Sequence, residues 1–340
     1  MNQFVRPAKV KREKSMIQKK QKSLFEPRNY YKPFEYPEAY KFYEMHEKMH
    51  WLVDEVPMHQ DVLDWKNKLT KQEKHFLTQI FRLFTQSDVD VAGAYANKYI
   101  PLFPKPEIRM MLLSFAAREA IHIQAYSHLI DTLGMPEGTY RAFMEYEAMK
   151  EKHDFIEEFM GTDNTMIVQQ IAAFSAFTEG MQLFSSFIML LNFTRFNKMN
   201  GMGQIIAWSI KDESVHVDGM TWLFKEFLKE HRDIWNDDLK KQLYTIAEKM
   251  VELEDKFIDL AFETGGVEGL TIEDVKRYIR YIADRRLIGL GMKGIFKVKN
   301  NPLPWVEEIL NAPEHANFFE QRATAYSKGS LTGDWGKIWS

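Results

Sequence analysis

The strongest constraint on the fold is a set of carboxylates and histidines that interrupt apolar helical sequence. Glu119 and His122 lie in LLSFAAREAIH, and Glu213 and His216 follow the apolar run IIAWSI. Residues three positions apart share one face of an α-helix, so each Glu-x-x-His pair can direct a carboxylate and an imidazole to one point. Unpaired charge in an apolar interior is costly, and both pairs therefore require compensation there.

A third Glu-x-x-His pair, Glu47 and His50, has a different setting. Its neighbours are Glu44, His46 and Lys48, a composition typical of a solvent-facing helix surface. In a chain with ten histidines, about one such pair is expected by chance. We therefore assign this pair to the surface and not to a metal site.

Two isolated carboxylates, Asp88 and Glu179, also lie within apolar helical sequence. Residues equidistant from the turn of an antiparallel helix hairpin lie at the same height. The midpoint of 88 and 119 falls in the proline-rich break at 101–106, and the midpoint of 179 and 213 falls where the break at 197–203 begins. Each carboxylate is therefore expected level with one Glu-x-x-His pair. Asp90 is the alternative to Asp88, but two positions along a helix turn it away from that face.

The rest of the chain reads as helical. From about Pro37 to Asn311, apolar residues recur every three or four positions, and no alternating run lies between hairpin turn signals. Breaks are expected at the prolines of 101–106, at Gly201 and Gly203, and before Thr271, a plausible N-cap. No Gly/Ser-rich linker divides the body. The sequence thus predicts an all-α fold, a single helical bundle.

Four carboxylates and two histidines from four helices match the ligands of ferritin-like dinuclear carboxylate proteins. Such an oxygen-rich donor set suits iron or manganese better than a closed zinc site. We therefore predict a ferritin-like bundle with a dinuclear carboxylate metal site in its core, bound by Asp88, Glu119, His122, Glu179, Glu213 and His216. Tyr126 lies seven residues after Glu119 on the same face, as a redox residue or as ordinary core packing.

Composition excludes several functional classes. The chain has no cysteine, which rules out disulfides, thiolate nucleophiles and iron–sulfur clusters. Its 45 Lys and Arg against 48 Asp and Glu give a net charge of −3, which favours neither nucleic acid nor an anionic membrane. Uninterrupted apolar runs such as Ile205–Trp208 are far shorter than the roughly eighteen residues of a membrane span. We expect a cytoplasmic protein without nucleic-acid or membrane partners.

Both ends differ from the helical body. Residues 1–30 are polar and locally basic, and we expect a mobile arm there. Residues 311–340 carry Tyr326, Trp335 and Trp339 toward a Gly/Ser/Thr/Lys-rich end. Aromatic side chains in such a tail either fold back onto the core or bind a partner. The ferritin-like domain is therefore expected at 31–310, followed by a flexible tail at 311–340.

Several segments together identify a family. These segments are Glu119-Ala-Ile-His122-Ile-Gln-Ala-Tyr126, Thr-Gln-Ser-Asp88, Phe-Thr-Glu179-Gly and Lys211-Asp212-Glu213-Ser-Val-His216. Their combination resembles the radical-bearing small (beta) subunit of class I ribonucleotide reductase, over nearly the whole chain from His50-Trp51 to Tyr326. It implies that the six ligands hold two metal ions per chain, iron first, with manganese or a mixed pair as alternatives. This centre would activate oxygen and oxidise Tyr126 to a radical.

The resemblance also implies partners. The radical oxidation would pass along Trp51, Asp212 and Tyr326 to a separate large (alpha) subunit, which reduces the ribonucleotide with its own cysteines. The tail at 311–340 would dock that subunit, and the small subunit would be a homodimer. The presence of Tyr126 disfavours the branch of the family that has phenylalanine at this position and a mixed metal centre.

Three other functions fit parts of this pattern. A ferritin-like oxidase or hydroxylase would use the same ligands on an organic substrate but would have no use for Trp51 or Tyr326. An iron-storage protein of this fold is usually shorter and lacks an aromatic tail. A purely structural helical protein would use none of these residues chemically. Exchange of Tyr126 for phenylalanine separates these functions from radical generation.

Overall fold

The computed structural model describes residues 23–159 and 161–310. The expected basic arm at 1–30 lies mostly outside these residues. The expected docking tail at 311–340, including Tyr326, lies wholly outside them.

The described residues form α-helices joined by short 3-10 or π-helical segments. In chain order these are α1 (Pro37–Glu47), η1 (Val53–Glu55), α2 (His59–Leu63), η2 (Asp64–Lys68), α3 (Lys71–Ala94), η3 (Tyr95–Tyr99), α4 (Ile100–Leu102), α5 (Pro106–Thr132), α6 (Gly138–Arg141), η4 (Ala142–Glu145), α7 (Glu147–Glu157), α8 (Asn164–Ile171), η5 (Ala172–Gln182), α9 (Leu183–Leu191), η6 (Asn192–Phe196), α10 (Asn200–Glu230), η7 (Arg232–Ile234), α11 (Asp237–Ala261), α12 (Ile272–Gly289) and α13 (Pro304–Leu310). Over the described ranges no β-strand occurs, and the all-α prediction is confirmed.

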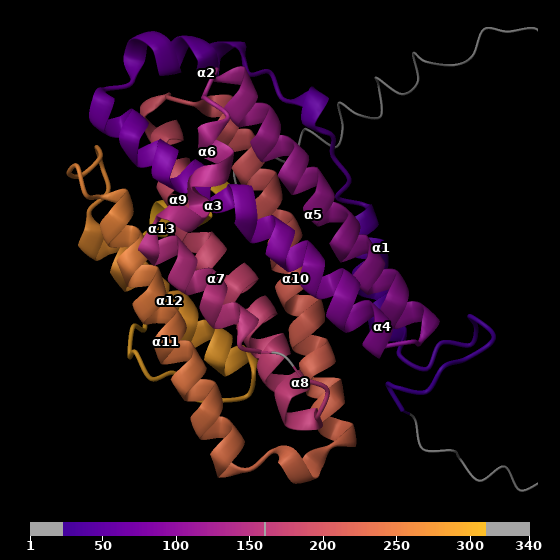
Figure 1. The fold of residues 1–340 in the computed structure, drawn as a ribbon. Coiled ribbons are helices and arrows are strands. Elements are labelled where there is room, and N and C mark those ends of the chain that lie inside the picture. Colours follow the sequence, from indigo (N-terminus) through magenta and orange to yellow (C-terminus); the bar gives the residue numbers. More distant parts are fainter. Residues whose placement is uncertain (1–22, 160, 311–340) are drawn as a thin grey trace, which may run out of the picture.

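Long helices run side by side through the molecule (Figure 1). Helix α3 packs on α5, and α10 packs on the continuous stretch formed by η5 and α9. Helix α1 covers α5, whereas α11 and α12 cover η5. The centre of the bundle is therefore enclosed by α3, α5, η5 and α10.

The ends of these helices follow from local sequence. Thr70 and Glu73 form a reciprocal capping box at the start of α3, which satisfies two backbone N–H groups that the helix leaves free. Pro106 occupies the first turn of α5, where its missing N–H costs nothing. Thr271 caps α12 through the backbone N–H of Asp274. The expected break at 101–106 and the expected cap at Thr271 are confirmed.

The expectation for Gly201 and Gly203 was wrong in one respect. Helix α10 begins at Asn200, so both glycines lie inside its first turn and do not interrupt it. They are needed for close approach, because a Cβ on Gly203 would lie 2.1 Å from Cγ2 of Thr194. The actual break is made by Asn197 and Met199, which adopt left-handed conformations with φ of 53° and 54°.

A buried aspartate from a distant segment holds the start of α10. Oδ2 and Oδ1 of Asp61 accept hydrogen bonds from the backbone N–H groups of Gly201 at 2.9 Å and Met202 at 2.7 Å. These are N–H groups that have no acceptor within the helix, and the helix dipole favours a carboxylate there. Because α10 carries Glu213 and His216, this cap also fixes the position of two candidate ligands.

One long helical stretch resembles a membrane span by length and composition. It covers Asn164–Phe196, and 94% of its most apolar window is buried inside the protein. Ser, Thr and Gln residues interrupt the apolar runs, so the stretch does not show as one uninterrupted run in the sequence. It is the buried helical stretch that α8, η5, α9 and η6 form in the bundle.

We predict that Asp61→Ala lowers the free energy of unfolding by about 1–3 kcal/mol, because two buried N–H groups lose their acceptor. Asp61→Asn keeps one acceptor oxygen and should lose less. Denaturant unfolding monitored by circular dichroism measures both losses, with Asp54→Ala, an exposed aspartate nearby, as the control. Equal, small losses for Asp61→Ala and Asp54→Ala would show that the cap contributes nothing.

Candidate metal centre

Six ionisable side chains meet in the centre of the bundle. They come from α3, α5, η5 and α10, and each is at most 1% exposed to solvent: Asp88, Glu119, His122, Glu179, Glu213 and His216. All six ligands predicted from the sequence are thus brought together. Asp90 points elsewhere, and its Oδ2 lies 2.7 Å from Nδ1 of His153.

The six side chains divide into two overlapping groups. Ligand atoms of Asp88, Glu119 and His122 lie within 4.8 Å of one another, as do those of Glu119, Glu179, Glu213 and His216. Glu119 directs one oxygen toward Nδ1 of His122 at 3.4 Å and the other toward Nδ1 of His216 at 3.0 Å. Glu213 does the same at 3.3 Å and 3.2 Å. Two carboxylates therefore lie between two adjacent positions, as in a dinuclear centre.

The inward-facing atoms of this cluster lack hydrogen-bond partners. In the described part of the chain, the buried side-chain atoms without a partner include Asp88 Oδ2, both carboxylate oxygens of Glu119 and Glu213, Glu179 Oε2, and Nδ1 of both histidines. Buried polar atoms are normally satisfied, so a concentration of unsatisfied acceptors at one point fits a site that binds cations. Carboxylate and imidazole donors in this number fit iron or manganese.

The pKa values of the cluster reflect its excess of negative charge. Burial raises the pKa of Asp88 well above its usual range, and the charge of Glu119 raises it further. Burial, together with the charge of Glu213, raises the pKa of Glu179 to about 7. Burial would lower the pKa values of His122 and His216, but the surrounding carboxylates outweigh it and raise both. The centre therefore favours positive charge.

A π-helical segment presents Glu179 to the cluster. Segment η5 has the wider turn of a π-helix over all eleven of its residues, a local geometry that is frequent at functional sites. Tyr95 donates a hydrogen bond to Oε1 of Glu179 at 2.8 Å, and Arg286 Nε donates to the backbone carbonyl of Gly180 at 2.7 Å. These contacts hold the segment from two sides. The sequence pattern predicts an ordinary helix here and gives no indication of Tyr95.

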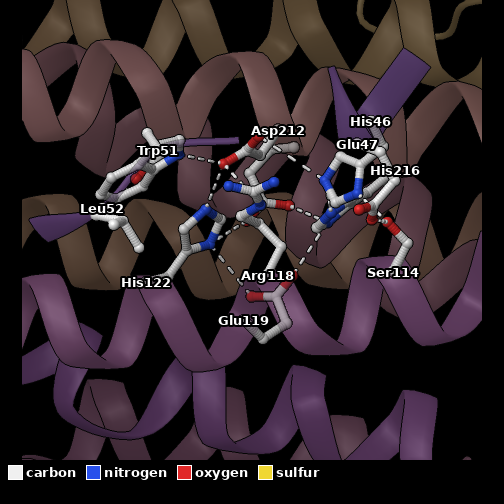
Figure 2. A network of polar contacts seen from close by, with 12 residues as sticks. His46, Glu47, Trp51, Leu52, Ser114, Arg118, Glu119, His122, Asp212 and His216 are labelled. Carbon is white, nitrogen blue, oxygen red and sulfur yellow. Dashed lines mark hydrogen bonds and ion pairs between the residues drawn. The ribbon is translucent and has the colours of Figure 1, made fainter. Parts of the chain in front are cut away.

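Asp212 connects His122 to a tryptophan. Oδ2 of Asp212 accepts a hydrogen bond from Trp51 Nε1 at 2.7 Å and lies 3.1 Å from Nε2 of His122 (Figure 2). Nε of Arg118 lies 3.6 Å from the same oxygen. Trp51 is 2% exposed, but Leu52 beside it is 44% exposed. A continuous set of polar contacts therefore leads from His122 through Asp212 to Trp51.

Tyr126 lies beside the cluster on α5. It is 3% exposed, its ring centroid is 6.4 Å from that of His122, and its hydroxyl donates a hydrogen bond to Ser209 Oγ at 3.1 Å. Phe84 stacks on the Tyr126 ring with centroids 4.4 Å apart, and Phe187 stacks on Phe84. The phenol thus lies between a stacked apolar ring and the edge of the carboxylate–histidine cluster.

Sequence reasoning missed three further residues of this region: His46, Arg118 and Ser209. Glu47 and His50 are exposed as expected. His46, which directly precedes Glu47, is instead fully buried against His216. The sequence did contain a signal for this burial: Ala39, Phe42 and His46 are spaced so that they share one face of α1. Arg118 precedes Glu119 directly and gave no separate signal.

Comparison with known proteins agrees with this geometry. A family model described as "Ribonucleotide reductase, small chain" matches residues 28–302. The probable ribonucleoside-diphosphate reductase small subunit 376L of Invertebrate iridescent virus 6 is 49% identical, over 94% of this chain and 99% of that protein. Subunit 048L of Invertebrate iridescent virus 3 is 51% identical, over 93% and 88%.

Solved structures agree in fold. The dimanganese(II)-NrdF structure from Streptococcus sanguinis superposes with a TM-score of 0.71 at 22% identity, over 82% of this chain and 96% of that one. The fold is therefore ferritin-like, and the buried carboxylate–histidine cluster within it supports a dinuclear metal site. Small chains of ribonucleotide reductase generate a radical and work with a large subunit, and the enzyme is an oxidoreductase. From the matched family model and the two close relatives, we conclude that the chain belongs to the family of ribonucleotide reductase small chains.

Proposed function

We propose that the chain generates a radical on Tyr126 for the reduction of ribonucleoside diphosphates by a separate large subunit. Two metal ions would be held by Asp88, Glu119, His122, Glu179, Glu213 and His216. The observation that carries the proposal is the pair of ligand groups that share Glu119, with Tyr126 beside one of them. When bound, the metal ions together with oxygen would supply the oxidant that removes an electron and a proton from a tyrosine.

Iron is the first candidate for the metal, with manganese or a mixed pair as alternatives. Four carboxylates and two imidazoles suit either ion, and donor type alone does not separate them. The similar Streptococcus sanguinis protein is a dimanganese(II) form. The surroundings of Tyr126 support it as the radical site under any of these metals, because its side chain is 3% exposed and Phe84 stacks on its ring.

A route for the oxidation to leave the centre is supported by the contacts of Asp212. Trp51 donates its Nε1–H to the carboxylate that also contacts His122, so the indole can lose an electron while its proton stays in a hydrogen bond. We propose that this route runs through Asp212 and Trp51 and then to Tyr326. The tail at 311–340 would dock the large subunit, oxygen would be the oxidant, and two copies of the chain would form a homodimer in the cytoplasm.

The alternatives lack comparable support. A ferritin-like oxidase would have no use for the buried Trp51 and its hydrogen bond to Asp212. An iron-storage protein has no role for the Trp51–Asp212–His122 contact. The family assignment favours radical generation over both.

We predict that Tyr126→Phe abolishes the organic radical signal while the protein still binds about two metal ions per chain. The phenol is the proposed radical site but contributes none of the six ligands. Electron paramagnetic resonance after addition of Fe(II) and oxygen, and separately of Mn(II), together with metal analysis, measures both quantities. Tyr278→Phe, a buried tyrosine on α12, is the control and should keep the radical. A persistent tyrosyl signal in Tyr126→Phe would refute the assignment.

We predict that Trp51→Phe reduces ribonucleotide reduction with the large subunit to background, while the Tyr126 radical is still formed. Phenylalanine retains the ring packing but cannot donate to Asp212. Turnover of a ribonucleoside diphosphate and the radical yield are measured on the same sample. Trp222→Phe, a tryptophan that packs against Tyr36 and Phe42, should leave both unchanged. Full turnover by Trp51→Phe would exclude Trp51 from the route.

A further inference from the structure

The two histidines of the metal centre have different outer partners. Each turns Nδ1 toward the carboxylates and Nε2 away from them (Figure 2). Nε2 of His122 meets the carboxylate of Asp212, whereas Nε2 of His216 lies 3.1 Å from Nε2 of His46. We infer that His46 is a positioning residue, which fixes His216 in the tautomer and orientation that its metal position requires. The inference rests on the proposed ligand role of His216.

The direction of each hydrogen bond follows from the cluster outward. A metal ion requires a bare Nδ1 on His216, so its Nε2 must carry the hydrogen and donate it to Nε2 of His46. His46 Nδ1 then carries the hydrogen and donates it to Ser114 Oγ at 2.7 Å. Ser114 donates in turn to Oε1 of Glu47 at 2.6 Å. Each group after His216 in this series of hydrogen bonds therefore donates one hydrogen bond outward and accepts one from the side of the metal centre, up to the accepting carboxylate of Glu47.

Glu47, the last group in this series of hydrogen bonds, sets the direction in which each of them runs. Glu47 lies on the exposed surface of α1, and its Oε1 accepts the hydrogen bond from Ser114 Oγ. It therefore fixes the orientation of the Ser114 hydroxyl and, through it, the tautomer of His46. Helix α1 packs on both α5 and α10, so this surface residue acts on a side chain in the core.

Packing alone does not account for an imidazole at this position. His46 is fully buried, with its ring centroid 5.1 Å from that of Phe115 and 4.9 Å from that of His216. An apolar ring would fill the same space without the cost of burying two polar nitrogens. Both nitrogens have partners, and one of these is a candidate ligand. Outer partners of a ligating histidine fix its tautomer and orientation, and their loss typically costs about 10–100-fold in metal affinity.

The test compares two substitutions with opposite properties. His46→Gln keeps an acceptor for His216 and a donor for Ser114 but loses the ring. His46→Phe keeps the ring against Phe115 but loses both hydrogen bonds. Mn(II) is titrated into each apoprotein, and free Mn(II) is followed by electron paramagnetic resonance. His75→Phe, a partly exposed histidine that pairs with Glu263 at 2.6 Å, is the matched control.

The wild type, the His75 variant and His46→Gln should bind two Mn(II) per chain with similar affinity. In His46→Phe, one equivalent should weaken by about 10–100-fold while the other is unchanged. The opposite pattern, with affinity preserved in Phe and lost in Gln, would show that His46 only fills space and would overturn the inference. A wild type that binds fewer than two metal ions per chain with Mn(II) and also with Fe(II) would instead refute the proposed function itself.

Circular dichroism of the apoproteins shows whether each variant folds. If His46→Phe is unfolded, Ser114→Ala provides the same test, because it removes the acceptor of His46 Nδ1–H without changing the histidine. It should weaken one Mn(II) equivalent in the same direction. Unchanged binding of both equivalents in Ser114→Ala would overturn the inference.

Discussion

The structure depends on the compensation of negative charge in the middle of the bundle. Asp88, Glu119, Glu179 and Glu213 bring four carboxylates into a space that contains two histidines, and Asp212 adds a fifth at its edge beside Arg118. An uncompensated buried charge costs several kcal/mol, and hydrogen bonds satisfy only part of this cluster. Two divalent cations would neutralise the four carboxylates. The same carboxylates that destabilise the apoprotein would thus bind the metal ions.

The surrounding helices hold these side chains through contacts at some distance from the centre. Asp61 caps the helix that carries Glu213 and His216, and the hydrogen bonds of Tyr95 and Arg286 hold the π-helical segment of Glu179. Asp212 and His46 contact the outer nitrogens of the two histidines. Scaffold and site are therefore one network, in which local helix-end chemistry determines where the ligands lie.

The fold class and the six clustered residues were predictable from spacing and from the apolar sequence around each residue. Apolar periodicity gave the helices, and the equal distances from the two turns brought Asp88 and Glu179 level with the Glu-x-x-His pairs. The outer contacts were not predictable in the same way, because they depend on how helices distant in sequence pack. His46 was judged by its charged neighbours, although one helix face can be buried while the next is exposed. The π-helical geometry at Glu179 has no clear sequence signal.

The most direct test of this account is X-ray diffraction from crystals of the metal-loaded protein, with anomalous data on both sides of the iron and manganese absorption edges. The account predicts two anomalous peaks per chain, one among Asp88, Glu119 and His122 and the other among Glu179, Glu213 and His216, with Glu119 between them. The edge at which each peak appears identifies its metal. A single peak, or peaks only outside these side chains, would contradict a dinuclear centre.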